Sequence, residues 1–112
     1  MSGLDDDWQD VCAADDLGDE DVLQHWVDDD LPLAIYNIDG EFYATADRCS
    51  HQQAYLSDGF VTDEQIECPL HQGRYHVPTG AVTVGPACEG IPTYPVCVHN
   101  GRIYVQYAEN IE

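Results

Sequence analysis

Hydrophobic residues along this chain alternate with polar ones in short runs, and that period belongs to β-strands rather than helices. Four of the runs form two pairs, each joined by a two-residue turn signal: 33–38 and 41–45 around Asp39-Gly40, and 93–99 and 102–107 around Asn100-Gly101. Asp-Gly and Asn-Gly are favoured in tight hairpin turns because both central residues need a positive φ. The pattern therefore predicts two antiparallel hairpins.

Two further strands are predicted nearer the N-terminus. They cover Trp8–Val11 and Val22–Val27, with an acidic turn through Asp15, Asp16 and Gly18 between them. Pro32 stands at the start of the 33–38 strand, where a missing N–H is tolerated. Helical periodicity is weak and no internal repeat occurs, so the sequence predicts an all-β fold.

The alternation near the C-terminus also predicts which side chains face inward. Val96 and Val98 alternate with Cys97 and His99, which is the period of a strand with one buried face. We therefore expect the two valines to be buried and Cys97 to face outward.

A segment of different composition, at about 47–80, lies between the strand groups. It is rich in Gly, Pro, Ser, His and Cys and contains no long strand pattern. Such an insertion in a small domain is usually either functional or disordered, and the two short motifs within it favour a function. With 112 residues in all, the chain has the length of one domain. We expect a single domain, 1–112, with an inserted functional segment.

The composition is strongly acidic. Twenty-two Asp and Glu stand against three Arg and no Lys, giving a net charge of −19, and 12 of the acids fall in the first 30 residues. This charge repels phosphate backbones and anionic membrane surfaces, which argues against nucleic-acid or membrane binding. No apolar run reaches the roughly 20 residues that span a bilayer, and the N-terminus lacks the pattern of a secretion signal. We expect a cytoplasmic protein.

Candidate chemistry is concentrated in two short motifs of the inserted segment. They are Cys49-Ser50-His51 and Cys68-Pro69-Leu70-His71, with 16 residues between His51 and Cys68. An odd number of cysteines, five, in a chain without a secretion signal favours metal binding or catalysis over a disulfide framework. The candidate metal ligands are therefore two thiolates and two imidazoles: Cys49, His51, Cys68 and His71.

Two kinds of metal centre use such a set. Zinc takes two Cys and two His, but its usual motifs place the cysteines together and then the histidines. The Cys-His, Cys-His order suits a two-iron cluster, because each motif then gives one ligand to each iron. Cys49 and Cys68 would hold one iron, and His51 and His71 the other. Both the zinc and the two-iron alternatives remain open on spacing alone.

The motifs resemble the cluster-binding signature of Rieske [2Fe–2S] proteins. The similarity extends from about residue 8 to 107 and includes AYLSDG, IECPLHQGRY, PTYPVCV and NGRIYV. Within the family the chain is similar to the ferredoxins of bacterial aromatic-ring-hydroxylating dioxygenase systems. The resemblance implies a fold of antiparallel sheets (a β-sandwich or three-sheet domain) in which two inserted loops hold one [2Fe–2S] cluster through Cys49, His51, Cys68 and His71.

The same resemblance implies a function. These proteins carry single electrons from a flavin-dependent ferredoxin reductase to a terminal oxygenase and are not enzymes in their own right. We expect a monomeric carrier of this kind. The alternatives are a Rieske-like subunit of a larger oxidoreductase, similar to the small subunit of nitrite reductases, and a zinc-stabilised binding module.

Departures from the respiratory members of the family bear on the reduction potential. Ala54 and Leu70 stand where those proteins have two disulfide-bonded cysteines, and Gly73 stands where they have a serine hydroxyl. Fewer hydrogen bonds to the cluster sulfurs lower the potential, so we expect the low end of the Rieske range of about −150 to +300 mV. Tyr75 points the other way if its hydroxyl reaches the Cys49 sulfur. The alternative is a core aromatic residue with its hydroxyl at the surface.

The remaining cysteines and histidines lack a partner at metal-ligand spacing. Cys12, Cys88 and Cys97 are interpreted as small apolar residues, and His25, His76 and His99 as surface residues. Pro86 belongs to a segment that, by resemblance, shields the cluster as a third loop.

The position of the acids changes what the charge implies. Residues 31–112 carry 10 acids and three Arg, a net charge of −7, so most of the negative charge precedes the two motifs. The acidity is consistent with steering toward basic partners, and equally with adaptation to high salt, where ions screen self-repulsion.

Overall fold

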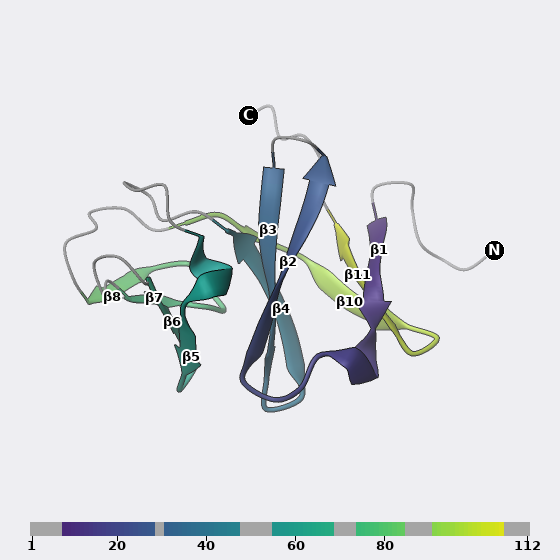
Figure 1. Cartoon of the computed structure of the whole chain (residues 1–112), viewed down its shortest axis with the longest axis horizontal. Helices are drawn as coiled ribbons and strands as arrows, with labels where there is room; N and C mark the ends of the chain where they lie inside the picture. Colours follow the sequence, from purple (N-terminus) through teal and green to yellow (C-terminus); the bar gives the residue numbers. More distant parts are fainter. Residues whose placement is uncertain (1–7, 29–30, 48–54, 69–73, 85–90, 107–112) are drawn as a thin grey trace.

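The computed structural model describes residues 8–28, 31–47, 55–68, 74–84 and 91–106. Within these ranges the chain forms strands arranged in three antiparallel sheets, with two single-turn 3-10 helices. The predicted all-β, three-sheet fold is confirmed. One sheet lies in the middle, with the other two on opposite sides of it (Figure 1).

The central sheet has the order β2-β3-β4-β9. Its strands are β2 (Asp21–Asp28), β3 (Leu31–Ile38), β4 (Glu41–Ala46) and β9 (Thr93–Tyr94). The first three follow one another along the chain as a meander, and the short β9 pairs only with Ala44 and Thr45. The predicted strands at 22–27, 33–38 and 41–45 are therefore confirmed, each slightly longer than expected.

Strand β3 is buried on both faces and joins two hydrophobic cores. Leu33 and Ile35 pack with Val105 in the core between the central sheet and the C-terminal strands. Tyr36, on the other face, packs with Ile66 in the core beneath the inserted segment. A short, nearly continuous apolar run is typical of a strand covered on both sides.

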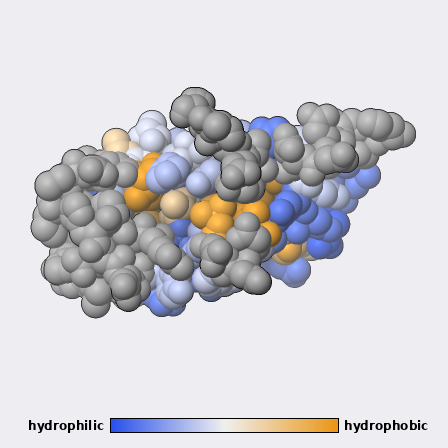
Figure 2. Space-filling model, turned by 90° about the horizontal axis from the view of Figure 1, so that it is seen from above, coloured by the Kyte–Doolittle hydropathy of each residue, from blue (hydrophilic) through white to orange (hydrophobic). Residues whose placement is uncertain are grey.

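A three-stranded outer sheet has the order β1-β11-β10. It consists of β1 (Trp8–Ala13), which leads into the 3-10 turn η1 (Ala14–Asp16), together with β10 (Val96–His99) and β11 (Arg102–Gln106). The end of the molecule formed by these strands is largely covered by hydrophilic side chains, whereas apolar side chains gather near the centre of the same face (Figure 2).

The predicted strand 93–99 is divided in the structure. Pro95 separates β9 of the central sheet from β10 of the outer sheet, because proline has no N–H with which to continue a ladder. The predicted inward valine face of β10 is wrong at Val98, which is 47% exposed. Cys97, expected to face outward, is half-buried.

Both predicted hairpin turns are confirmed by their backbone angles. Asp39 and Gly40 have φ values of 59° and 86°, and Asn100 and Gly101 have 53° and 78°. Two successive positive φ values define the turn whose twist matches an antiparallel pair.

The third sheet is built from the segment after the first motif. It consists of β5 (Phe60–Thr62), β6 (Gln65–Glu67), β7 (Arg74–His76) and β8 (Val82–Val84), paired in chain order, and the 3-10 turn η2 (Leu56–Asp58) precedes it. The inserted segment expected at 47–80 thus carries short strands, and its sheet extends beyond residue 80. Figure 1 places this sheet on the opposite side of the central sheet from β1 and β11.

Candidate metal centre

Cys68 is the one candidate ligand among the described residues; Cys49, His51 and His71 lie outside them. Cys68 directly follows β6, is 2% exposed, and packs in the same core as Ile66 and Tyr75. Cys12 and Cys97 are half-buried free thiols that belong to the outer sheet.

The second motif is held by a hairpin. Glu67 and Arg74 are directly opposite each other in the register of β6 and β7. Their side chains form an ion pair, with an Arg74 guanidinium nitrogen 3.1 Å from Glu67 Oε1. Cys68 and His71 belong to the short connection between these paired residues, so the hairpin fixes both ends of the second motif.

The ends of the first motif are fixed by Asp47 and the start of η2. The Leu56 N–H donates to the Asp47 carbonyl at 2.7 Å. The Ser57 N–H and hydroxyl donate to the two carboxylate oxygens of Asp47 at 2.6 and 2.8 Å. Cys49 and His51 lie in the sequence between these residues, so three hydrogen bonds connect the two sides of the first motif.

Asp47 is a buried, hydrogen-bonded residue beside the first motif that the sequence interpretation did not single out. It is completely buried, and burial raises the pKa of its carboxyl group, an effect that hydrogen bonds from Gln24 and Ser57 oppose. Burying a carboxylate is unfavourable unless several donors compensate for the lost water. Its position two residues before Cys49 was the available signal, but sequence alone does not show which donors surround it.

The chain leaving the first motif passes directly against the strand that enters the second. A Cβ atom added at Gly59 would lie 1.9 Å from the Glu67 carbonyl oxygen, a distance that no side chain can occupy. Phe60 is also opposite Glu67 in the register of β5 and β6. Gly59 and Glu67, which we call the two motif bases, therefore lie side by side.

Tyr75 is completely enclosed rather than placed at the surface. It is 1% exposed and lies opposite Ile66 in β6. The alternative of a surface hydroxyl is therefore wrong. The expected bond to the Cys49 sulfur involves a residue outside the described ranges and stays a prediction.

The other sequence candidates do not form a second metal site within the described ranges. No group of three or more His, Cys, Asp or Glu side chains there is arranged to hold a metal ion. His25, His76 and His99 are all partly exposed. Burial, with a smaller effect from Asp16, raises the pKa of the half-buried Cys12. Cys88, Pro86, Gly73, Leu70 and Ala54 lie outside the described residues.

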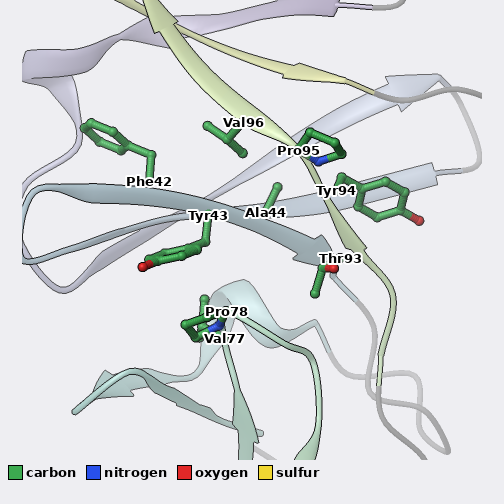
Figure 3. A pocket seen from close by; sticks show the side chains of 9 residues that line it. All are labelled: Phe42, Tyr43, Ala44, Val77, Pro78, Thr93, Tyr94, Pro95 and Val96. Carbon is green, nitrogen blue, oxygen red and sulfur yellow. The ribbon is translucent and has the colours of Figure 1, made fainter.

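A separate pocket of about 410 Å³ lies between β4, the Val77-Pro78 segment and the β9–β10 connection (Figure 3). It is lined by Phe42, Tyr43, Ala44, Val77, Pro78, Thr93, Tyr94, Pro95 and Val96. None of these side chains is a charged group, a thiol or an imidazole. The lining residues with polar side chains are Tyr43, Thr93 and Tyr94, which carry hydroxyl groups.

The donor set fits a [2Fe–2S] cluster with two thiolate and two imidazole ligands. Cys68 is buried, Gly59 after the first motif lies against Glu67 before the second, and the sequence supplies one Cys and one His in each motif. Thiolates and imidazoles together also suit zinc, so the ligand types alone do not choose between the two metals.

Comparison with known proteins distinguishes these alternatives. Residues 7–95 match the family model of the Rieske [2Fe-2S] domain. The chain is 42% identical over 98 residues to the ferredoxin component of the naphthalene 1,2-dioxygenase system of Pseudomonas putida, which covers 88% of this chain and 93% of that relative.

Two solved structures resemble the fold closely. One is a chain in the complex of reduced oxygenase and oxidized ferredoxin in carbazole 1,9a-dioxygenase, with a TM-score of 0.89 and 34% identity over 96% of this chain and 100% of that one. The other is a putative NADH-dependent nitrite reductase small subunit from Mycobacterium tuberculosis, with a TM-score of 0.82 over 92% and 96% of the two chains. At 24% identity it shows a shared fold alone.

No helix within the described ranges is long and apolar enough to cross a membrane. The three-sheet fold, the adjoining motif bases and the match over most of the sequence agree with one another. The chain therefore belongs to the Rieske [2Fe–2S] family, with ferredoxin components of dioxygenase systems among its relatives.

Proposed function

We propose that this protein is a one-electron carrier that passes electrons from a flavin-dependent reductase to a terminal oxygenase acting on an aromatic ring. The observation that carries the proposal is the convergence of the two motif bases, at Gly59 and Glu67, beside the buried Cys68. The ferredoxin relatives of dioxygenase systems support the assignment.

Four side chains would hold the cofactor. Cys49 and Cys68 would ligate one iron as thiolates, and His51 and His71 would ligate the other as neutral imidazoles. A bound [2Fe–2S] cluster accepts and returns one electron. Replacing two thiolates by imidazoles removes negative charge and therefore raises the reduction potential above that of clusters with four cysteines.

The protein's own residues would hold the ligands of this cofactor in fixed positions. The Glu67–Arg74 pair closes the β6–β7 hairpin, and Asp47 with Ser57 closes the first motif. Cys68 is shielded from water by the core that includes Ile66 and Tyr75. Ligands that are held in fixed positions and shielded from water rearrange little when the charge of the metal centre changes.

We further infer one domain over 1–112 that acts as a monomer in the cytoplasm and binds its two partners in turn. The inserted sheet shares a core with β3, which supports a single folding unit. The oxygenase–ferredoxin complex among the structural relatives supports the choice of an oxygenase partner. A nitrite reductase subunit resembles the chain only at the level of fold.

Metal content and EPR of the reduced protein test the cofactor. We expect two irons and two sulfides per chain and an EPR spectrum with a low average g-value. Cys68→Ser should abolish the signal, whereas the matched Cys97→Ser, in a free thiol of the outer sheet, should retain it. A colourless protein with one zinc would overturn the assignment.

Electron transfer to partners tests the carrier role separately. We expect a flavin-dependent reductase to reduce the purified protein, and an aromatic-ring oxygenase to reoxidise it during substrate turnover. A protein that holds its cluster but is isolated only as a permanent subunit of a larger enzyme would overturn the carrier role and leave the cofactor assignment standing.

A further inference from the structure

Both carboxylate oxygens of the buried Asp47 are engaged by hydrogen-bond donors. Oδ1 accepts the Ser57 N–H, and Oδ2 accepts the Ser57 hydroxyl and the side-chain N–H of Gln24, at 2.7 Å. Ser57 belongs to η2, after the first motif, and Gln24 belongs to β2 in the central sheet. One carboxylate thus joins the first motif to a strand that is remote in the sequence.

The orientation of Gln24 is fixed from its other side. The Trp26 indole N–H donates to Gln24 Oε1 at 3.0 Å, so the amide nitrogen of Gln24 points to Asp47. The Trp26 ring also packs edge-on against Tyr55, with ring centres 6.2 Å apart. Figure 1 shows η2 beside β2, which is the side where these contacts form.

We propose that Asp47 is a positioning residue for the cluster, holding the Cys49–His51 motif against β2 through Ser57 and Gln24. This inference rests on the proposed function, since it assumes that the motif carries two cluster ligands. Residues that hydrogen-bond to metal ligands, or pack against them, commonly restrict the positions and orientations that the ligands can adopt. Loss of the Asp47 contacts should therefore widen the range of cluster geometries while the fold persists.

The hydrogen-bond pattern gives this proposal a specific test. In Asp47→Asn, an amide nitrogen replaces one of the two carboxylate oxygens. In place of Oδ1 it would face the Ser57 N–H, and in place of Oδ2 it would face the amide nitrogen of Gln24, so a donor meets a donor in both orientations. Turning the Gln24 amide over would only move the conflict to the Trp26 N–H. Combining Asp47→Asn with Gln24→Glu removes every conflict, because the new carboxylate accepts both from the new amide and from Trp26.

The experiment measures the EPR line widths of the reduced, loaded protein and the rate at which an iron chelator removes the cluster. We expect Asp47→Asn to broaden the g-value distribution and to accelerate cluster loss by at least about tenfold. The double variant Asp47→Asn with Gln24→Glu should return both readouts toward wild type. Ser57→Ala removes one hydrogen bond and no charge, so it should change the line widths and the rate of cluster loss in the same direction by a smaller amount. This variant provides the test if Asp47→Asn does not fold.

The matched control is a variant that loses hydrogen bonds, as Asp47→Asn does, but at a position away from the first motif. Asn37→Ala removes a buried hydrogen bond to the Leu17 carbonyl and a partly buried one from the Gly40 N–H, near the C-terminal end of β3. It should leave the line widths and the chelation rate unchanged. The proposal is overturned if Asp47→Asn behaves as wild type, if the double variant is no better than the single one, or if Asn37→Ala has the same effects. A wild-type protein without a cluster would overturn the proposed function instead.

Discussion

Tyr75 lies directly opposite Ile66 in the register of β6 and β7, and both side chains are almost completely buried. Cys68 follows β6 and packs in the same core. Tyr75 therefore shares a hydrophobic core with Cys68, a proposed cluster ligand.

Removal of the Tyr75 hydroxyl should lower the reduction potential. If the hydroxyl donates to a ligand sulfur, it stabilises the more negative reduced state. We expect Tyr75→Phe to shift the midpoint negative by roughly 40 mV, which corresponds to about 1 kcal/mol for a one-electron couple. Protein-film voltammetry measures the shift.

Tyr36→Phe is the matched control for this prediction. Tyr36 is equally buried, but its hydroxyl lies 2.8 Å from the Thr45 hydroxyl in the central sheet. Its loss should reduce stability and leave the midpoint unchanged. Equal midpoints for Tyr75→Phe and wild type would contradict a bond to sulfur.

Gly59→Ala should destabilise the protein through a steric clash with backbone. The added Cβ would lie 1.9 Å from the Glu67 carbonyl oxygen, so the two motif bases would have to separate. We expect a loss of about 2–4 kcal/mol in the free energy of unfolding, the range of severe packing defects, and a reduced iron content. Urea denaturation and iron analysis measure the two effects.

Gly40→Ala separates that clash from simple backbone strain. Gly40 has a φ of 86° with no neighbouring atom within 4 Å of an added Cβ. The substitution should cost about 1–3 kcal/mol of strain at a hairpin far from the motifs, with normal iron content. Normal iron content in Gly59→Ala as well would show that the two motif bases need not adjoin.

His25 should make the protein less stable as the pH falls. Burial lowers the pKa of His25 below its usual 6.5, and the nearby Asp10 only partly opposes this. Below pH 6.5 the unfolded chain therefore binds a proton that the folded protein resists, so this contribution to stability is present above 6.5 and is lost on acidification. We expect His25→Gln to lose less thermal stability than wild type between pH 7.5 and 5.5.

His99→Gln provides the comparison for His25. His99 is partly exposed and packs edge-on against Tyr104 in the outer sheet. His99→Gln removes one imidazole from the outer sheet and leaves His25 in place, so it is the matched variant. An identical pH dependence in His25→Gln and wild type would refute the prediction.

High salt should raise the melting temperature. Five carboxylates surround one cleft of about 300 Å³, supplied by Asp19, Glu20, Asp39, Asp63 and Glu64. Salt screens their repulsion, so the melting temperature should climb as NaCl rises into the molar range. Calorimetry of the loaded protein provides the measurement.

Neutralising two of these carboxylates tests the cause. Asp39 and Asp63 have φ values of 59° and 53°, a conformation that asparagine also tolerates. Asp39→Asn with Asp63→Asn should raise the melting temperature at low salt and reduce the salt response. Asp15→Asn, at an exposed position of η1, should change the salt dependence of the melting temperature little. An unaltered salt dependence in the double variant would show that the cleft does not cause it.

Local chemistry explains which features could be predicted from the sequence. The turns at Asp39-Gly40 and Asn100-Gly101 depend only on the φ preferences of two adjacent residues, so the hairpins were predictable. The alternating runs likewise indicated the strands. At Val98 the same alternation was wrong, because a periodic pattern does not show whether another layer covers that face.

The sequence alone determined the strand content and the hairpins and indicated the candidate ligands, since each depends on residues close together along the chain. Only the tertiary structure decided how distant segments meet. It divided 93–99 between two sheets at Pro95, buried β3 on both faces, and brought Gly59 against Glu67. It also surrounded Asp47 with donors from Gln24 and Ser57. These contacts depend on long-range packing, in which a residue's role is set by the neighbours that the whole fold provides.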